Sequence, residues 1–242
     1  MVSPSGTGIV YVGTTARLSY ALGELPELPT KLASTDRRGV PVWSIIISAI
    51  VGEICFGPFK SWNSLVNAVT DATALMYAFA PVALASLQSR DGDRPRAYRM
   101  PASTVLLPVG FCSANLIIYW GGYDFLWKID IALLVGVLLY VIGAQVKGTL
   151  QNSMIQHGIW VVPWIAGITL LSWMGDYGDG AKHWMHHWVA GQWSDLIVVS
   201  AFSLVIYYWA VRIAMPSAAV KAAVRVDQEE ISSGDVLNVP LA

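Results

Sequence analysis

Charged residues are scarce in this sequence, and their scarcity is the first guide to its class. They make up 13% of the 242 residues, whereas an ordinary soluble domain carries about 25%. Hydrophobic residues make up 55% of the chain, and the mean hydropathy is +0.53. A soluble fold of this length has too little interior to bury so many apolar side chains. The composition therefore excludes an ordinary soluble domain and indicates an integral membrane protein.

Cysteine is also rare, and neither sign of charge is in excess. The net charge is -1 at pH 7, so the sequence has no overall positive field of the kind that attracts nucleic acid. The two cysteines, Cys55 and Cys112, lie inside apolar runs, where each behaves as a small hydrophobic side chain. They indicate neither a disulfide nor a metal site, and we expect no cofactor. No basic stretch precedes the first apolar run, so we expect no signal peptide.

Long apolar runs are what the sequence has in abundance. Crossing the hydrocarbon core of a bilayer takes about 20 helical residues. The first run is short, because its apolar part, 9–22, would span only about 21 Å as a helix. We predict an all-α integral membrane fold with about seven transmembrane helices, near residues 1–22, 42–60, 64–87, 104–120, 129–146, 159–174 and 196–215.

The lysines and arginines predict how these helices are oriented. If the loop 17–41 lies inside the cell, all but three of the 15 basic residues fall on that side. The other side keeps only Lys60, Lys128 and Lys182. This asymmetry agrees with the positive-inside rule. We therefore expect a multi-pass protein of the plasma (inner) membrane, with its amino terminus outside and its carboxy terminus in the cytoplasm. An odd number of spans with a short first one is most simply explained as the rear part of a longer carrier.

Two groups of motifs carry a resemblance to a known family. The sequence reads T-A-R at 15–17, A-L-G-E-L-P at 21–26 and R-G-V-P-V-W at 38–43. This series resembles the eighth helix, the following loop and the start of the ninth helix in permeases of the amino acid-polyamine-organocation (APC) superfamily. R-P-R-A-Y-R-M-P at 94–101 resembles the signature that precedes the eleventh helix. The motifs cover about the first 101 residues, and the remaining helices match in number and spacing only.

The resemblance implies the carboxy-terminal portion of an inverted-repeat (LeuT-like) transporter fold. In such carriers substrate binds at the midplane, where two broken helices expose backbone groups. Those helices, the first and the sixth, are not among the predicted spans. The resemblance divides the chain into part of the permease core (1–146), an extra pair of helices (147–215) with an interfacial loop (176–194), and a flexible cytoplasmic tail (216–242).

The implied function is secondary active transport of amino acids. The chain would be a truncated carrier in the bilayer that takes an amino acid or a related small amine together with a proton or sodium ion. The resemblance favours the proton. The alternative is a non-transporting membrane subunit or an inactive remnant.

The first predicted helix would form one wall of the substrate and ion site. Lined up with the family, Thr15 lies where sodium-coupled relatives use a hydroxyl to coordinate the ion, and Ala16 replaces a second hydroxyl. That replacement favours proton coupling. Gly8 would lie near the substrate. The alternative for Thr15 is a structural one, since hydroxyls in membrane helices also bond back to their own backbone.

Two acids, Glu53 and Asp71, fall inside predicted spans. Carboxylates at membrane depth are costly and are functional candidates by default, often in proton relays. Both would lie roughly 8 to 10 Å from the same side of the membrane, so they could meet and share a proton. The alternative is that both lie near the headgroups, solvated or bonded to neighbours such as Asn67, Thr70 or Trp62.

The histidines form one cluster, near the end of the chain. His183 and His187 are four residues apart, which places them on one face of a helix and suits a metal or a pH sensor. The cluster also includes His186, and no matching third ligand of suitable spacing stands out. Because tryptophans alternate with these histidines, an amphipathic segment at the membrane interface explains the stretch more simply.

Other membrane proteins fit the sequence less well. A retinal receptor needs a lysine in its last span, and 196–215 has none. A membrane haem protein needs paired histidines within spans, whereas all four histidines fall at ends or in a loop. A membrane enzyme needs a nucleophile or metal constellation, and we find none. We therefore expect a carrier and not an enzyme.

Overall fold

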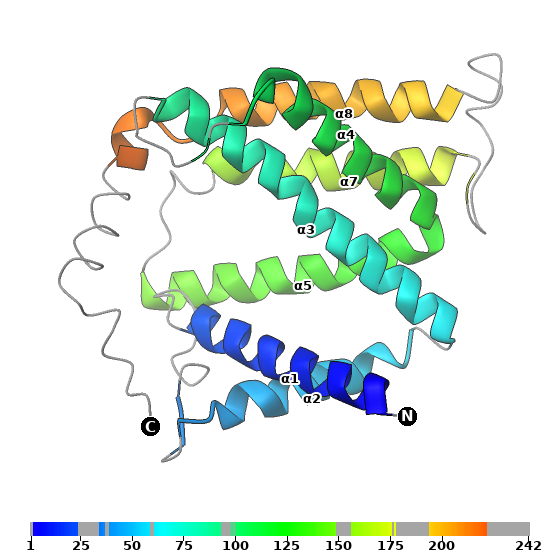
Figure 1. Cartoon of the computed structure of the whole chain (residues 1–242), viewed down its shortest axis with the longest axis vertical. Helices are drawn as coiled ribbons and strands as arrows, with labels where there is room; N and C mark the ends of the chain where they lie inside the picture. The colour runs from blue at the N-terminus through cyan, green and yellow to red at the C-terminus, as the bar shows by residue number, and fades with distance from the viewer. Residues whose placement is uncertain are drawn as a thin grey trace. The chain divides into compact units, whose positions relative to one another are not determined.

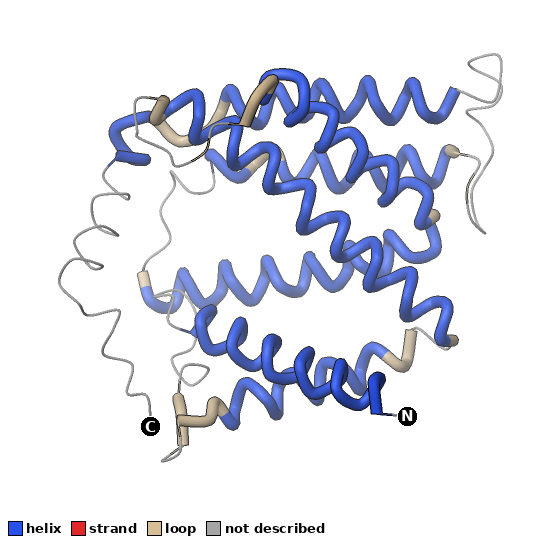
Figure 2. Tube along the Cα trace, viewed as in Figure 1, coloured by secondary structure: helices blue, strands red, loops and turns tan. Residues whose placement is uncertain are grey.

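The protein is helical throughout the part that the computed structural model describes. The described residues are 2–23, 34–36, 39–58, 61–92, 98, 100–148, 156–175, 177 and 194–221. Figure 2 shows helices joined by short loops over these ranges, with no strand among them. The predicted all-α membrane fold is confirmed. The helices are α1 (Val2–Gly23), α2 (Val42–Cys55), α3 (Trp62–Arg90), α4 (Ser103–Gly121), α5 (Tyr123–Lys147), α7 (Val161–Met174) and α8 (Ser194–Arg212), as labelled in Figure 1.

Five of the described helices are long and apolar enough to cross a membrane. They are α3, α4, α5, α8 and the stretch Gln156–Met174 that ends with α7. The helix α2 is apolar but has 14 residues, about 21 Å. It ends earlier than the predicted span 42–60 because Gly57 and Pro58 follow in a turn. The helix α1 has 22 residues, but its glycines, hydroxyls and Arg17 keep its hydropathy below that of the five.

Contacts divide the chain into two compact units. The first includes α1, α2 and the part of α5 from Ile131 onward. The second includes α3 from Val66 onward, α4, the start of α5, α7 and α8. In the first unit α1 and α2 pack against each other, and the side chains of Ala16 and Ser44 are buried. Small residues of this kind let membrane helices approach closely.

The second unit has an aromatic core. The helices α4, α7 and α8 contact one another, as their neighbouring ribbons in Figure 1 also show. Phe111 of α4 lies 5.5 Å from Trp164 of α7 and 5.9 Å from Tyr207 of α8, measured between ring centroids. Phe79 of α3 joins the cluster through an edge-on contact of 5.3 Å with Trp164. Edge-on and tilted pairs at these distances are favourable, so these rings join α3, α4, α7 and α8.

Polar contacts also shape the two ends of α3. Ser61 and Ser64 exchange hydrogen bonds between each hydroxyl and the other's backbone N–H at the start of α3, which is a reciprocal helix cap. At its other end, Nη2 of Arg90 donates a 2.9 Å hydrogen bond to the carbonyl oxygen of Arg212, at the end of α8. A cation at this position stabilises α8, because the carboxy terminus of a helix carries a partial negative charge.

The predicted division into a core, an extra helix pair and a tail stays a prediction. The predicted extra pair corresponds to α7 and α8, which pack on α3 and α4 in the second unit. Of the predicted tail, residues 217–221 form a short helical stretch. Residues 222–242 and most of the predicted loop 176–194 lie outside the described residues.

Candidate functional site

Asp71 is the most deeply buried of the predicted site residues. It lies in the third turn of α3 and is 1% exposed. Its Oδ2 is buried and has no hydrogen-bond partner among the described residues. A buried carboxylate oxygen without a donor is unusual, because the desolvation of the group is then left uncompensated. Protein atoms therefore shield Asp71 from solvent, while its predicted place in the membrane, in a proton relay or near the headgroups, stays a prediction.

A cavity of about 220 Å³ opens beside this carboxylate. Asn67 and Thr70 line it from α3, and Ile117, Trp120 and Gly121 line it from the last turns of α4. The carboxylate lies directly on Gly121, where any Cβ would collide with both of its oxygens. The absence of a side chain at position 121 is thus what leaves room for the carboxylate between α3 and α4.

Thr70 is next to Asp71 in sequence but is not its hydrogen-bond donor. The Thr70 hydroxyl donates a 2.9 Å bond to the carbonyl oxygen of Val66, one turn earlier in α3. This back-bonding occupies the hydrogen of the hydroxyl and leaves the oxygen lone pairs available. Thr70 therefore offers the cavity an acceptor oxygen and no donor hydrogen.

Glu53 has a different environment. It lies in the last turn of α2 and is exposed, two residues before the helix ends at Cys55. Because the helix ends early, Glu53 is about 3 Å from the end of α2 along its axis. Its predicted depth of 8 to 10 Å in the membrane stays a prediction. Glu53 belongs to the first unit and Asp71 to the second. A proton shared between the two stays a prediction.

Gly8 and Thr15, the predicted wall residues, both lie on α1 and are exposed. A Cβ at Gly8 would meet no atom within 4 Å. The Thr15 hydroxyl donates a 2.8 Å hydrogen bond to the carbonyl oxygen of Tyr11 in the preceding turn. Thr14 bonds to Val10 in the same way, at 2.9 Å. These bonds agree with the structural alternative for Thr15, but the oxygen keeps its lone pairs, so an ion-binding role stays a prediction.

A half-buried acid, Asp130, and a buried one, Asp195, were not singled out from the sequence. Oδ2 of Asp130 in α5 accepts a 2.6 Å hydrogen bond from the Thr169 hydroxyl in α7, and its Oδ1 is buried without a partner among the residues that the structure describes. Asp195, in the first turn of α8, accepts a 2.6 Å hydrogen bond from the Tyr119 hydroxyl. Asp130 is the second residue of the predicted span 129–146, so its position in an apolar run could have indicated it. Asp195 falls just before the predicted span 196–215 and gave no such signal.

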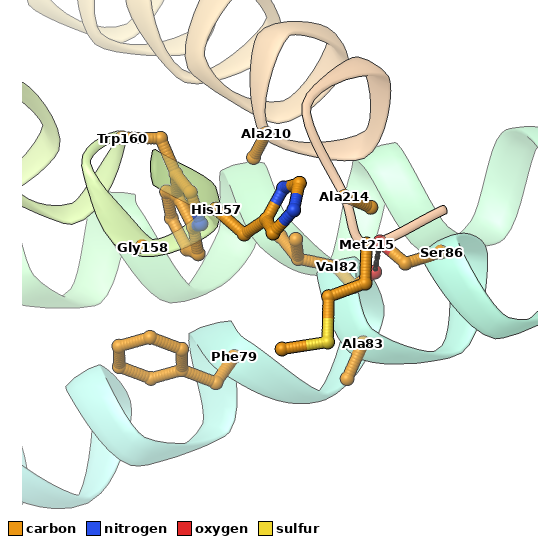
Figure 3. Close-up of a pocket in the computed structure, with 10 residues that line it drawn as sticks. All are labelled: Phe79, Val82, Ala83, Ser86, His157, Gly158, Trp160, Ala210, Ala214 and Met215. Carbon is orange, nitrogen blue, oxygen red and sulfur yellow. Dashed lines mark hydrogen bonds between the residues drawn. The ribbon is translucent and has the colours of Figure 1, made fainter. Parts of the chain in front are cut away.

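A second cavity, of about 370 Å³, lies near the other end of the second unit. Figure 3 shows that its lining comes from α3, from the turn before α7 and from the segment that ends α8. Within the described part of its lining, only Ser86 and His157 carry side-chain polar groups besides the indole of Trp160. The His157 Nδ1 donates a 2.6 Å hydrogen bond to the carbonyl oxygen of Ile213. This cavity offers few partners for the two charged groups of an amino acid.

The histidine cluster lies outside the described residues. His183, His186 and His187 fall in the range 178–193, so their predicted place at the interface stays a prediction. Among the residues that the structure describes, no group of three or more His, Cys, Asp and Glu side chains is arranged to hold a metal ion.

Comparison with known proteins relates the chain to amino-acid transporters. It is 28% identical to the glutamate/serine transporter AimA of Bacillus subtilis, over 87% of this chain and 39% of AimA. It is 29% identical to the aspartate-proton symporter of the same organism, over 91% of this chain and 42% of the symporter. The aromatic amino acid transport protein AroP of Escherichia coli K12 is 29% identical over 39% of this chain.

These matches concern sequence similarity to curated proteins. No family model and no solved structure matches the chain. The chain spans about two fifths of the length of the two transporters that it matches over most of its own length. The resemblance predicted from the motifs at 15–43 and 94–101 is confirmed: this chain is related to amino-acid transporters of the APC superfamily.

Proposed function

We propose that this chain takes part in secondary active transport of amino acids, as the carboxy-terminal part of an APC-type permease. The observation that carries the proposal is similarity to two amino-acid transporters over 87% and 91% of the chain. The five apolar helices that are long enough to cross a membrane support it. A transporter that moves its substrate unchanged also agrees with the expectation that the chain is not an enzyme.

The substrate class follows from the same two relatives. One is named for glutamate and serine and the other for aspartate, and both match most of the chain. AroP, which is named for aromatic amino acids, matches only 39% of it. We therefore propose acidic amino acids and serine as the substrates.

We propose the proton as the coupling ion. The name of the aspartate-proton symporter supports it. So does Ala16, a buried residue that stands where the family resemblance places a second ion-coordinating hydroxyl. Sodium coupling is the alternative that a transport assay separates.

The site residues enter the proposal with separate roles. Gly8 and Thr15 would line the substrate and ion path from α1, and Glu53 and Asp71 would pass the proton. The burial of Asp71 and its unpartnered oxygen support it as the more central of the two acids.

The surface supports a place in the lipid bilayer. On α1, Ile9, Val10 and Tyr11 are each at least two thirds exposed, and α5 exposes Leu134, Leu139 and Val146. Such side chains require lipid or further protein around them. We propose the inner membrane, with the amino terminus outside, because the basic residues are distributed so unequally between the two sides.

Uptake into proteoliposomes that contain the full chain tests the proposal. We expect labelled glutamate, aspartate or serine to accumulate when the outside is made acidic, and a protonophore to abolish the accumulation. Replacing sodium by potassium on both sides should leave the rate unchanged. Protein-free liposomes and liposomes with heat-denatured protein are the controls.

The same assay separates the alternatives. Uptake that requires sodium and does not depend on the pH gradient would contradict the proposal that the proton is the coupling ion. It would still support the proposal that the chain transports amino acids. No uptake above the controls would support a non-transporting subunit or an inactive remnant.

A further inference from the structure

The cavity beside Asp71 has the properties of a cation site. We propose that Asp71, with Asn67, Thr70 and the end of α4, binds a monovalent cation at the end of the second unit where α3 begins and α4 ends. This inference goes beyond the proposed transport, because it assigns a defined site and a ligand class. It rests on the geometry of α3 and α4 and not on what the relatives carry.

The charge around the cavity is negative. The Asp71 side chain is 1% exposed, and its Oδ2 has no hydrogen-bond partner among the described residues. Gly121, which touches the carboxylate, is the last residue of α4. The partial negative charge at the end of α4 is largely offset by the partial positive charge at the start of α5, at Tyr123, so the negative charge at the cavity is that of Asp71. A cation in the cavity would compensate this buried anion, which is otherwise costly.

The groups that line the cavity suit a hard cation. The Asn67 amide oxygen and the Thr70 hydroxyl oxygen are acceptors on the same stretch of α3 as Asp71. Since the Thr70 hydrogen is already donated to Val66, its oxygen presents lone pairs. Carboxylate, amide and hydroxyl oxygens are the ligands that hard cations take. Of the described residues that line this cavity, Asp71 is the one acid, so its single charge matches a monovalent ion.

The size of the cavity and its aromatic wall are compatible with two kinds of cation. A volume of about 220 Å³ holds a partly hydrated sodium ion or a small organic ammonium group. For comparison, one molecule of liquid water takes about 30 Å³. The Trp120 ring, which lines the cavity, favours an ammonium group through a cation–π contact. The shared chemistry is one positive charge held by Asp71.

Binding of radiolabelled sodium and of radiolabelled methylammonium to the purified full chain tests the site. Both are measured in detergent at constant ionic strength, each with the other as competitor. We expect saturable binding of at least one, and an affinity lower by about tenfold or more in Asp71→Asn. Gly121→Ala should have a similar effect, because its methyl group displaces the carboxylate.

Two controls accompany these variants. Gly110→Ala changes the same helix, but its Cβ would meet only Pro81 Cγ at an ordinary 3.5 Å, so its affinity should equal that of the wild type. Asp36→Asn removes an exposed acid outside the cavity and should also change nothing. Size-exclusion elution and circular dichroism establish that each variant folds. If Asp71→Asn does not fold, the comparison of cation affinity between Gly121→Ala and Gly110→Ala tests the site.

The outcomes are distinct. Binding of sodium alone identifies an inorganic ion, and binding of methylammonium identifies the amine, and both support the site. The proposal is overturned if neither cation binds the wild type, or if the folded Asp71 and Gly121 variants bind as the wild type does. Because this experiment measures cation binding and not amino-acid uptake, the cation site and the proposed transport can each be supported or contradicted independently of the other.

Discussion

The phenolic hydroxyl of Tyr119 donates a 2.6 Å hydrogen bond to Oδ2 of Asp195, between α4 and α8. Both side chains are buried, and the two helices pack along each other. The Ser194 hydroxyl also reaches the carboxylate, at 3.3 Å to Oδ1. That distance is long for an O–H···O bond, whose usual range ends near 3.0 Å. Tyr119 is therefore the principal donor to this buried acid.

Removing this donor should destabilise the second unit. A hydrogen bond between membrane helices averages about 0.6 kcal/mol, but a buried acid left short of donors costs roughly 1–3 kcal/mol. We expect Tyr119→Phe to lower the free energy of unfolding by the larger amount, measured by SDS titration in mixed micelles. Tyr208→Phe on α8, where the ring is 58% exposed, is the matched control and should change little. Equal effects of the two substitutions would contradict the role of Tyr119.

A substitution at Gly175 should disturb the same contact between Tyr119 and Asp195. A Cβ at this position would collide with the Tyr119 ring and hydroxyl, and the ring is fully buried and cannot swing away. We expect Gly175→Ala to destabilise the protein by about 1–3 kcal/mol, the usual cost of overpacking. Gly158→Ala, whose Cβ would meet no atom within 4 Å, serves as the control.

A double-mutant cycle checks the mechanism of this effect. Since Gly175→Ala and Tyr119→Phe disturb one contact, their combined cost should be less than the sum of the single costs. Additive costs would show that Gly175 acts elsewhere.

A third prediction concerns the hydrogen bond between Thr169 and Asp130. The Thr169 hydroxyl is the donor to Oδ2 of Asp130, and Oδ1 has no donor in the described part of the chain. Thr169→Val keeps the shape of the side chain and removes that donor. We expect a loss of roughly 1–3 kcal/mol in the free energy of unfolding, measured as above. Thr104→Val, at an exposed position on α4, should be neutral within about 0.5 kcal/mol. A neutral Thr169→Val would show that Asp130 finds another donor.

The helices themselves were largely predictable from the sequence. The span predicted at 64–87 is the helix Trp62–Arg90, and the span at 104–120 is Ser103–Gly121. Hydropathy and length are local properties, so they locate such helices well. Their ends depend on finer signals. The reciprocal cap of Ser61 and Ser64 starts α3 before the apolar run, and the turn at Gly57 and Pro58 ends α2 early.

The partners of the buried acids were not predictable in this way. Asp71 was a candidate because it interrupts an apolar run, but its neighbour Gly121 lies on another helix. Tyr119 and Asp195 are 76 positions apart. Hydropathy indicates how deep a residue lies and says nothing of which helix faces it. The cavity beside Asp71 and the acids at 130 and 195 are therefore findings of the structure.

The orientation of α3 gives the last prediction. The asymmetry of lysine and arginine predicts that its start lies outside the cell and its end, at Arg90, inside. In a variant with Cys55 and Cys112 replaced by alanine, single cysteines are introduced as Asn63→Cys or Ser89→Cys, both at exposed positions of α3. A membrane-impermeant maleimide should label the cysteine at position 63 in intact cells, and the cysteine at 89 only after permeabilisation. Both cysteines should react fully with the maleimide in detergent. This labelling is the control that each introduced thiol is reactive. The reverse pattern would invert the whole topology, and would place the Asp71 cavity nearer the cytoplasmic face.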